Sequence, residues 1–152
     1  MGVNFQIGQC RIYVDTDSTK KYYENLPRIS ENCNCDDCLY FENKVIQKDI
    51  RLFRILIEMG VDLERQPNVN PDGVSSIGQT AKYKRSYMGY YHIFGKLNKI
   101  QNKTATRDDE GEIETVDFYE TTDDTNIQYK IKKEIDDKLT IEFYLECEKI
   151  IM

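Results

Sequence analysis

Residues 138–150, KLTIEFYLECEKI, alternate between apolar and polar side chains along most of their length. The apolar set is Leu139, Ile141, Phe143, Leu145 and Cys147. The polar set contains Thr140, Glu142, Tyr144 and Glu146. Because successive side chains of a strand point to opposite faces of its sheet, this period of two predicts a strand with one buried face and one solvated face.

The same alternation recurs earlier in the chain and predicts an antiparallel sheet. Further strand-like stretches occupy residues 86–97, 112–120 and 126–133. Polar, turn-forming residues separate the later stretches at 107–111, 121–125 and 134–137. We therefore predict that the four strands form a meander, with consecutive strands as neighbours. Near the N-terminus CRIYVDT (residues 10–16) alternates too, and we expect this strand to pair with an edge of the meander.

Between these strand regions, residues 36–59 carry a helical pattern. Apolar residues recur there at steps of three, four and seven: Leu39, Ile46, Ile50, Phe53 and Ile57. Gly60 followed by Val61 is typical of a left-handed helix end, and the prolines and glycines of residues 65–82 predict a long loop. Since the apolar face of a sheet needs a cover, we predict an α+β fold. One long amphipathic helix would cover one face of an antiparallel meander of about four to five strands, in a single domain over residues 1–152.

Composition limits the class of protein. The chain has 152 residues, of which 39% are hydrophobic and 32% are charged, and this balance is typical of a globular domain with its own core. It shows no signal-peptide pattern and no apolar run of membrane-spanning length. We therefore expect a cytoplasmic protein without a membrane partner. In that reducing compartment the five cysteines are thiols or metal ligands rather than disulfides.

Charge is distributed unevenly along the chain. Residues 105–148 carry 15 acidic and 5 basic residues, a net charge of −10, whereas residues 1–104 carry a net charge of +3. Such an acidic segment argues against a nucleic-acid partner and favours a protein partner, for which a basic surface is one option. The lysines that accompany the tyrosines of residues 82–99 leave a single-stranded nucleic-acid platform as the alternative.

ENCNCDDCLYF (residues 31–41) contains three cysteines, Cys33, Cys35 and Cys38. The simplest interpretation is three half-buried thiols at the start of a helix. A zinc ion is the second interpretation, because C-x-x-C is the common half of a structural zinc site. The candidates for a fourth ligand are His92, Cys10, Cys147 and Asp36. A thiol oxidoreductase is the third, since Cys35 and Cys38 precede a predicted helix.

No catalytic constellation is evident. His92, the single histidine, lies in YMGYYHIFG (residues 87–95) among aromatic residues, and no acid or nucleophile stands at a recognisable spacing from it. A lone histidine of this kind is more typical of a hydrogen-bonded structural residue than of a catalyst. Phosphate-binding loops, dinucleotide fingerprints and metalloprotease or calcium-loop motifs are absent.

Three segments together resemble a family of small uncharacterised proteins of Gram-positive bacteria and their mobile elements. They are YVDTDSTKKYYENLPRISENCNCDDCLYF, MGVDLERQP and GYYHIFGKL, with the matching positions Cys33, Cys35, Cys38, Phe41, His92 and Gly95. The resemblance covers about two thirds of the chain and brings no activity with it. It implies a bacterial, intracellular context, and one domain that holds both the cysteines and the Tyr-His strand.

Our hypothesis for function is a non-enzymatic, acidic interaction protein that binds another macromolecule, such as an immunity or anti-defence factor. It depends on the missing catalytic constellation and on the acidic segment. The alternative is a zinc-binding domain with a structural or catalytic metal at Cys33, Cys35, Cys38 and His92.

Overall fold

A computed structural model of the chain describes residues 2–7, 10–32, 36–65, 75–81, 84–99, 104–108, 111–122, 124–133 and 137–148. The strands are β1 (Gly2–Ile7), β2 (Cys10–Asp15), β3 (Ser75–Ala81), β4 (Lys84–Lys99), β5 (Thr104–Asp108), β6 (Gly111–Thr121), β7 (Thr125–Lys133) and β8 (Lys138–Glu148). The helices are α1 (Thr16–Glu24), α2 (Ile29–Asn32), α3 (Asp36–Tyr40) and α4 (Arg51–Glu58), with a π-helical turn η1 (Phe41–Val45) between α3 and α4.

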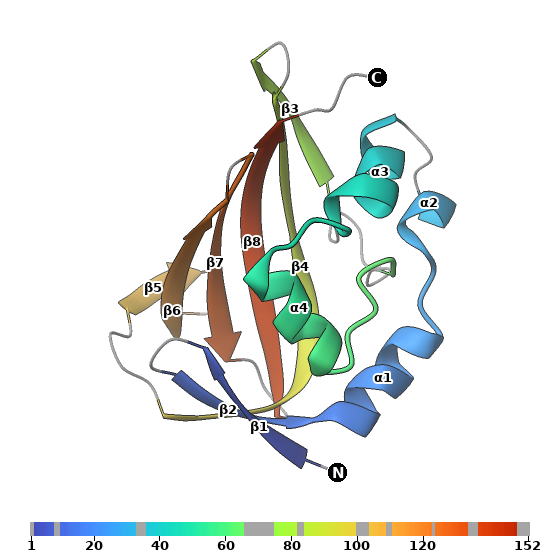
Figure 1. The fold of residues 1–152 in the computed structure, drawn as a ribbon. Helices are drawn as coiled ribbons and strands as arrows, with labels where there is room; N and C mark the ends of the chain where they lie inside the picture. The colour runs from blue at the N-terminus through green and yellow to red at the C-terminus, as the bar shows by residue number, and fades with distance from the viewer. Residues whose placement is uncertain are drawn as a thin grey trace.

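The strands of the described residues join into one antiparallel sheet of eight strands (Figure 1). Its order is β1-β2-β4-β8-β7-β6-β5. On one edge of β4, β2 pairs with residues 95–99 and β3 pairs with residues 84–88. The helices lie in front of the sheet and along one of its edges in Figure 1. The sheet is therefore covered on one side by the helical segments, and we call its opposite side the outer face.

The predicted fold class is wrong in two respects, of which the first concerns the sheet. Strands β5 to β8 do follow each other as a meander, and the N-terminal strand β2 pairs with β4 as expected. However, β4 pairs with β8 along residues 84–94, not with the next strand in the chain. Part of the predicted loop at 65–82 forms β3, and β1 and β5 were not anticipated, so the sheet has more strands than four to five.

The second error concerns the helix, since the described residues contain no long helix. Residues 36–59 are divided into α3, η1 and α4, and the chain is non-helical over residues 48–50. In a continuous helix Lys48 and Asp49 would lie on the same side as Val45 and Leu52, and burying their charges would be costly. The chain breaks instead. Ile50 takes an extended conformation and is fully buried, while Asp49 keeps 83% of its side chain exposed.

Contacts from the sheet hold the separated helix α4 in place. The Glu120 carboxylate of β6 accepts hydrogen bonds from the Arg51 and Leu52 backbone N–H groups at 2.7 and 3.3 Å. It thus provides acceptors for two N–H groups of the first turn of α4, which have no partner within the helix. The predicted left-handed end at Gly60 is confirmed. Gly60 has a φ of 104°, and the Val61 N–H donates to the Leu56 carbonyl at 3.0 Å.

Aromatic rings form the centre of the core between the helices and the sheet. Phe41 of η1 stacks on Phe143 of β8 with centroids 6.2 Å apart, and Phe53 of α4 meets the same ring edge-on. Tyr91 of β4 also stacks on Phe143, with centroids 5.8 Å apart. Phe143 therefore joins the helical layer to two central strands, and its neighbours on the apolar side of β8 are all buried.

Helix α1 covers the part of the β4 edge that lies between the residues paired with β3 and the residues paired with β2. The Tyr23 hydroxyl donates to the His92 carbonyl and accepts from the His92 N–H, each at 2.9 Å, and the Thr19 hydroxyl accepts from the Phe94 N–H at 3.1 Å. Side chains of a helix thus satisfy an edge that would otherwise expose backbone groups. Asp15 is the N-cap of α1, and its carboxylate accepts a hydrogen bond from the Ser18 N–H at 3.0 Å.

Candidate functional site

The outer face carries a continuous row of side chains that crosses four strands. Tyr119 of β6 pairs in register with Gln128 of β7, Gln128 with Tyr144 of β8, and Tyr144 with Met88 of β4. Residues opposite one another in adjacent strands share a face, so these four side chains form one line. We call Tyr119, Gln128, Tyr144 and Met88 the outer row.

The outer row is exposed although most of its members are large and partly apolar. Tyr119 is 77% exposed and Met88 is 49% exposed, the former being the most exposed large hydrophobic residue among the described side chains. Tyr144 is half-buried and Gln128 is exposed. Exposed aromatic and methionine side chains in one contiguous patch are typical of surfaces that bind another protein.

Charged side chains border the outer row on one side. Lys130 of β7 pairs in register with Glu142 of β8, one step along both strands from Gln128 and Tyr144. The Lys132 Nζ lies 3.1 Å from the Glu142 Oε1. On the other side of the row, Asn126 and Glu146 are partners in register. A partly apolar centre with a polar border is the usual composition of a protein interface.

His92 lies on the outer face, at the edge that α1 closes. Its ring packs against Tyr90 at 4.8 Å and Tyr22 of α1 at 5.9 Å, and its Nδ1 lies 3.0 Å from the Thr140 Oγ1. The side chain is 7% exposed. The ring therefore lies on the same face as the outer row and is separated from it by the pair of Tyr90 and Glu142.

The predicted metal ligands fall into different places. Cys33 and Cys35 lie outside the described residues. Cys38 is buried in the core on α3, in the helical layer, whereas the His92 ring lies on the outer face. Among the side chains that the structure describes, no three or more His, Cys, Asp or Glu residues form a group that could hold a metal ion. The zinc site stays a prediction, and Cys10 and Cys147 are buried core thiols.

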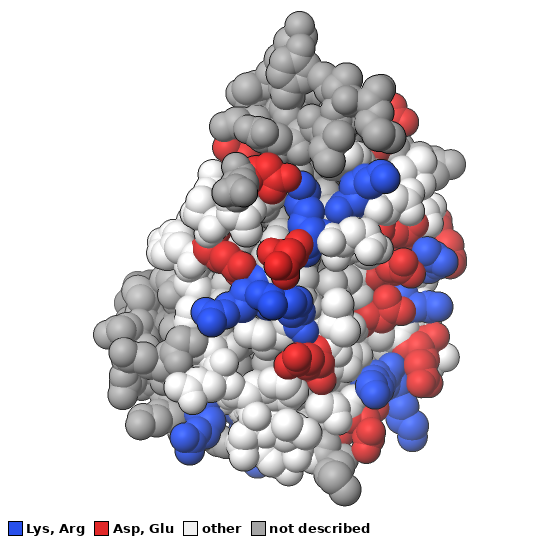
Figure 2. Space-filling model, in the orientation of Figure 1, with Lys and Arg blue, Asp and Glu red and all other residues white. Residues whose placement is uncertain are grey.

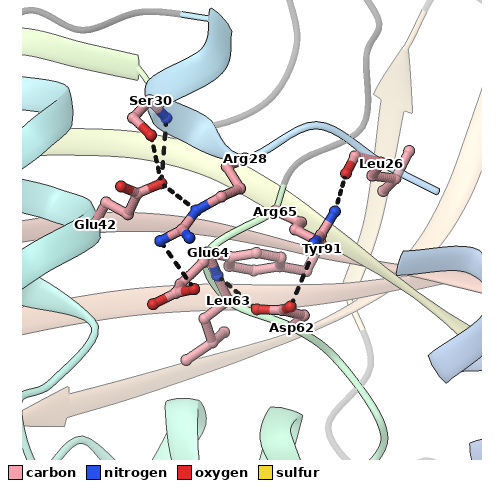
Figure 3. Close-up of polar contacts among 9 residues, drawn as sticks. All are labelled: Leu26, Arg28, Ser30, Glu42, Asp62, Leu63, Glu64, Arg65 and Tyr91. Carbon is pink, nitrogen blue, oxygen red and sulfur yellow. Dashed lines mark hydrogen bonds and ion pairs between the residues drawn. The ribbon is translucent and has the colours of Figure 1, made fainter. Parts of the chain in front are cut away.

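A buried carboxylate, Glu42, lies close to Ser30 and is the other candidate for a catalytic group (Figure 3). It is 4% exposed, and its Oε1 accepts from the Ser30 backbone N–H and hydroxyl at 3.2 and 3.1 Å. The Arg28 guanidinium lies 3.6 Å from the same oxygen and 3.2 Å from Glu64. Histidine takes no part in this network, so it offers no proton relay from serine to a base.

The Glu42 network instead joins two chain segments that are distant in sequence. The Arg65 guanidinium donates to the Leu26 carbonyl, and the Ile29 N–H donates to the Glu64 carbonyl at 2.8 Å. The buried Tyr91 hydroxyl donates to the Leu63 carbonyl at 2.9 Å, and burial raises the pKa of Tyr91 so that it stays a donor. The Arg28, Ile29 and Arg65 contacts hold residues 26–30 against residues 62–65, while Glu42 and Tyr91 join these two segments to η1 and β4 (Figure 3).

Several acidic residues of the C-terminal third have partners within the chain. Glu120 caps α4, Asp124 pairs with Lys48, and Glu142 pairs with Lys132. The Lys48 ammonium, as a hydrogen-bond donor to Asp124, lowers the pKa of that carboxyl below its usual 3.8. Basic and acidic side chains also alternate over the helix-bearing face in Figure 2. The surface described here is therefore mixed in charge, although the chain is acidic.

Comparison with protein-family models, curated proteins and solved structures finds no match. None of the helices in the described part of the chain has the length and apolarity needed to cross a bilayer.

The outer row was not identified from the sequence, although part of its signal was present. The alternation places Tyr144 on the polar side of its strand, and Met88 shares a side with His92. An aromatic residue on the polar side of an alternating strand was the available signal. What the sequence lacks is the register, which alone shows that Tyr119, Tyr144 and Met88 are neighbours.

Proposed function

We propose that this chain is a non-enzymatic interaction protein that binds a protein partner through the outer row and its charged border. This is the class to which immunity and anti-defence factors belong. The observation that carries the proposal is the exposure of Tyr119 and Met88 in one row across four strands.

The energetics of association support this choice of surface. Covering apolar area contributes about 25 cal/mol per Å², and tyrosine side chains are among the residues that most often dominate binding energy. A sheet also presents these side chains at little entropic cost, because the hydrogen-bonded strands are already ordered. The outer face is thus prepared to bind without rearrangement.

The charges of the described outer face favour a partner of mixed charge. Lys130 and Lys132 stand beside Glu142, so the face itself carries both signs. A basic partner, which the charge of the whole acidic segment favours, would bind through other residues. We therefore assign the outer row to a protein surface with its own apolar centre and charges of both signs.

Site-specific photocrosslinking in cells tests this proposal. A photoreactive phenylalanine analogue at position 119 should give discrete protein adducts, because Tyr119 lies at the proposed contact. The matched control is the same analogue at position 57, since Ile57 is 56% exposed but lies on α4, in the helical layer. Adducts from position 119 alone support the proposal. The absence of adducts at 119, or equal adducts at both positions, contradicts it.

The zinc-binding alternative keeps its own test. Metal analysis of protein purified without chelator or added metal, combined with thiol alkylation, measures whether Cys33, Cys35 and Cys38 are protected by a bound ion. About one zinc per chain would establish the alternative, and its absence would remove it.

A further inference from the structure

The outer face is self-complementary, and we propose that its partner is a second copy of this chain. This inference rests on the proposed function, because it names the occupant of the same surface. The two copies would pack outer face against outer face, as the two sheets of a β-sandwich do. Their relation would be a two-fold axis that runs parallel to the strands, between β7 and β8.

The strand order places complementary residues across such an axis. Rotation about it brings β7 of one copy over β8 of the other, and β6 over β4. Lys130 of one copy then faces Glu142 of the other, since the two residues are partners in register within each chain. The same rotation repeats this contact with the roles of the copies exchanged. The dimer therefore has two attractive contacts between Lys130 and Glu142, and neither residue faces its own copy in the partner.

The axis also matches the most exposed side chains of the face. Tyr119 lies on β6 and Met88 on β4, the strands that the rotation superimposes, and both belong to the outer row. Each tyrosine ring would therefore cover a methionine of the other copy, a favourable contact between sulfur and an aromatic ring. Gln128 would face Tyr144, which provides a hydrogen-bonding group near the axis.

The size of the face predicts a weak dimer. Strands lie about 4.8 Å apart and residues on one side of a strand about 6.7 Å apart. Four strands and three rows therefore cover on the order of 400 Å² per copy, compared with about 800 Å² in a standard interface. We expect dissociation in the micromolar range or weaker, so that the chain changes from monomer to dimer as its concentration increases.

Sedimentation velocity over a concentration series tests the inference with charge-reversal variants. Lys130→Glu and Glu142→Lys should each weaken the dimer about tenfold or more, because each opposes like charges at both contacts. An equimolar mixture of the two variants should restore the dimer, since every contact then joins opposite charges. Loss of folding cannot imitate this restoration. Tyr119→Ser should weaken the dimer as well, and Ile57→Ser on α4 should leave it unchanged.

Two results would overturn the inference: a chain that stays monomeric at all concentrations, or a dimer indifferent to Tyr119→Ser and to both charge reversals. The crosslinking experiment separates this failure from failure of the proposed function. A monomeric chain whose position 119 still captures a discrete different protein overturns the dimer and leaves the proposed function standing. A monomeric chain with no adduct at position 119 contradicts both.

Discussion

The two sides of β8 have similar secondary structure and opposite roles. On the inner side Leu139, Ile141 and Phe143 are at most 4% exposed and pack under the helices. On the outer side Tyr144 and Glu142 lie in register with residues of β4 and β7. One strand thus contributes stability through one set of residues and a candidate binding surface through the other. The following substitutions test whether the two roles separate as cleanly as the geometry indicates.

Phe143→Ala should have the largest effect on stability. It removes the ring that joins Phe41, Phe53 and Tyr91, so we expect a loss of about 3–5 kcal/mol in the free energy of unfolding, measured with denaturant. Tyr144→Ala, one residue away on the outer face, should cost less than about 1 kcal/mol. Comparable losses from both variants would show that the two sides of β8 are not distinct.

Tyr23→Phe should cost about 1–3 kcal/mol, because it leaves the buried His92 N–H and carbonyl without their common partner. Burial raises the pKa of Tyr23, so its hydroxyl remains protonated over the usual pH range. Chemical denaturation gives the stability, and hydrogen exchange at the His92 amide reports the local effect. The control is Tyr144→Phe on the outer face. If hydrogen exchange at the His92 amide is unchanged in Tyr23→Phe, α1 does not protect this edge of β4.

Glu120→Ala should cost about 0.5–2 kcal/mol through loss of the cap on α4. Glu146→Ala provides the comparison, since this second acidic residue lies on the outer face in register with Ser86. We expect its effect to remain within about 0.5 kcal/mol. In thermal denaturation Glu120→Ala should therefore be less stable than Glu146→Ala. The reverse order would show that Glu146, not Glu120, is the stabilising acid.

Asp124→Asn should give the smallest effect, visible mainly as a changed pH dependence. A carboxyl with a lowered pKa contributes stability above its unfolded value of 3.8, and this contribution is lost as pH falls through the folded pKa. The wild-type chain should therefore lose more stability between pH 7 and acid than Asp124→Asn does. Asp137→Asn serves as the control, and identical pH profiles for all three proteins would contradict the Lys48 contact.

Five of the eight described strands could be predicted from the sequence, because the signal of an alternating strand is local. The sheet face on which each residue of β7 and β8 lies can be predicted from the residues next to it in the sequence, because the period of two depends on no distant contact. Strand neighbours are a different matter. That β4 lies beside β8 depends on contacts between residues about fifty positions apart, and the alternation of either strand is satisfied by several orders.

The error in the helix has an equally physical cause. Lys48 and Asp49 interrupt the apolar side of the predicted helix, and this interruption was visible in the sequence. What decides the outcome is that Asp124 pairs with Lys48 and Glu120 caps the new helix start. Both partners come from β6 and the residues that follow it. The predicted Ile57 stripe position is 56% exposed as a result, whereas Leu52 and Leu56 are buried.

For the candidate site, residue type was readable and position was not. The structure shows the His92 ring in contact with the Thr140 hydroxyl on the outer face, and of the predicted cysteine ligands it describes only Cys38, which lies in the core. The outer row required the registers of three strand pairs. Binding surfaces on sheets are generally of this kind, since they use residues that are close only after the strands have paired.

Methionine oxidation tests most directly whether the outer face is the binding surface. Met88 is 49% exposed on this face and Met59 is fully buried in the core, so the two residues serve as probe and internal control. Peptide mapping after brief peroxide treatment measures both rates at low and high protein concentration. We predict that Met88 oxidises rapidly in dilute protein and becomes protected as the protein concentration rises, while Met59 oxidises slowly at every concentration. If the oxidation rate of Met88 does not change with protein concentration, and does not change when a partner captured at position 119 is added, the outer face is not the binding surface.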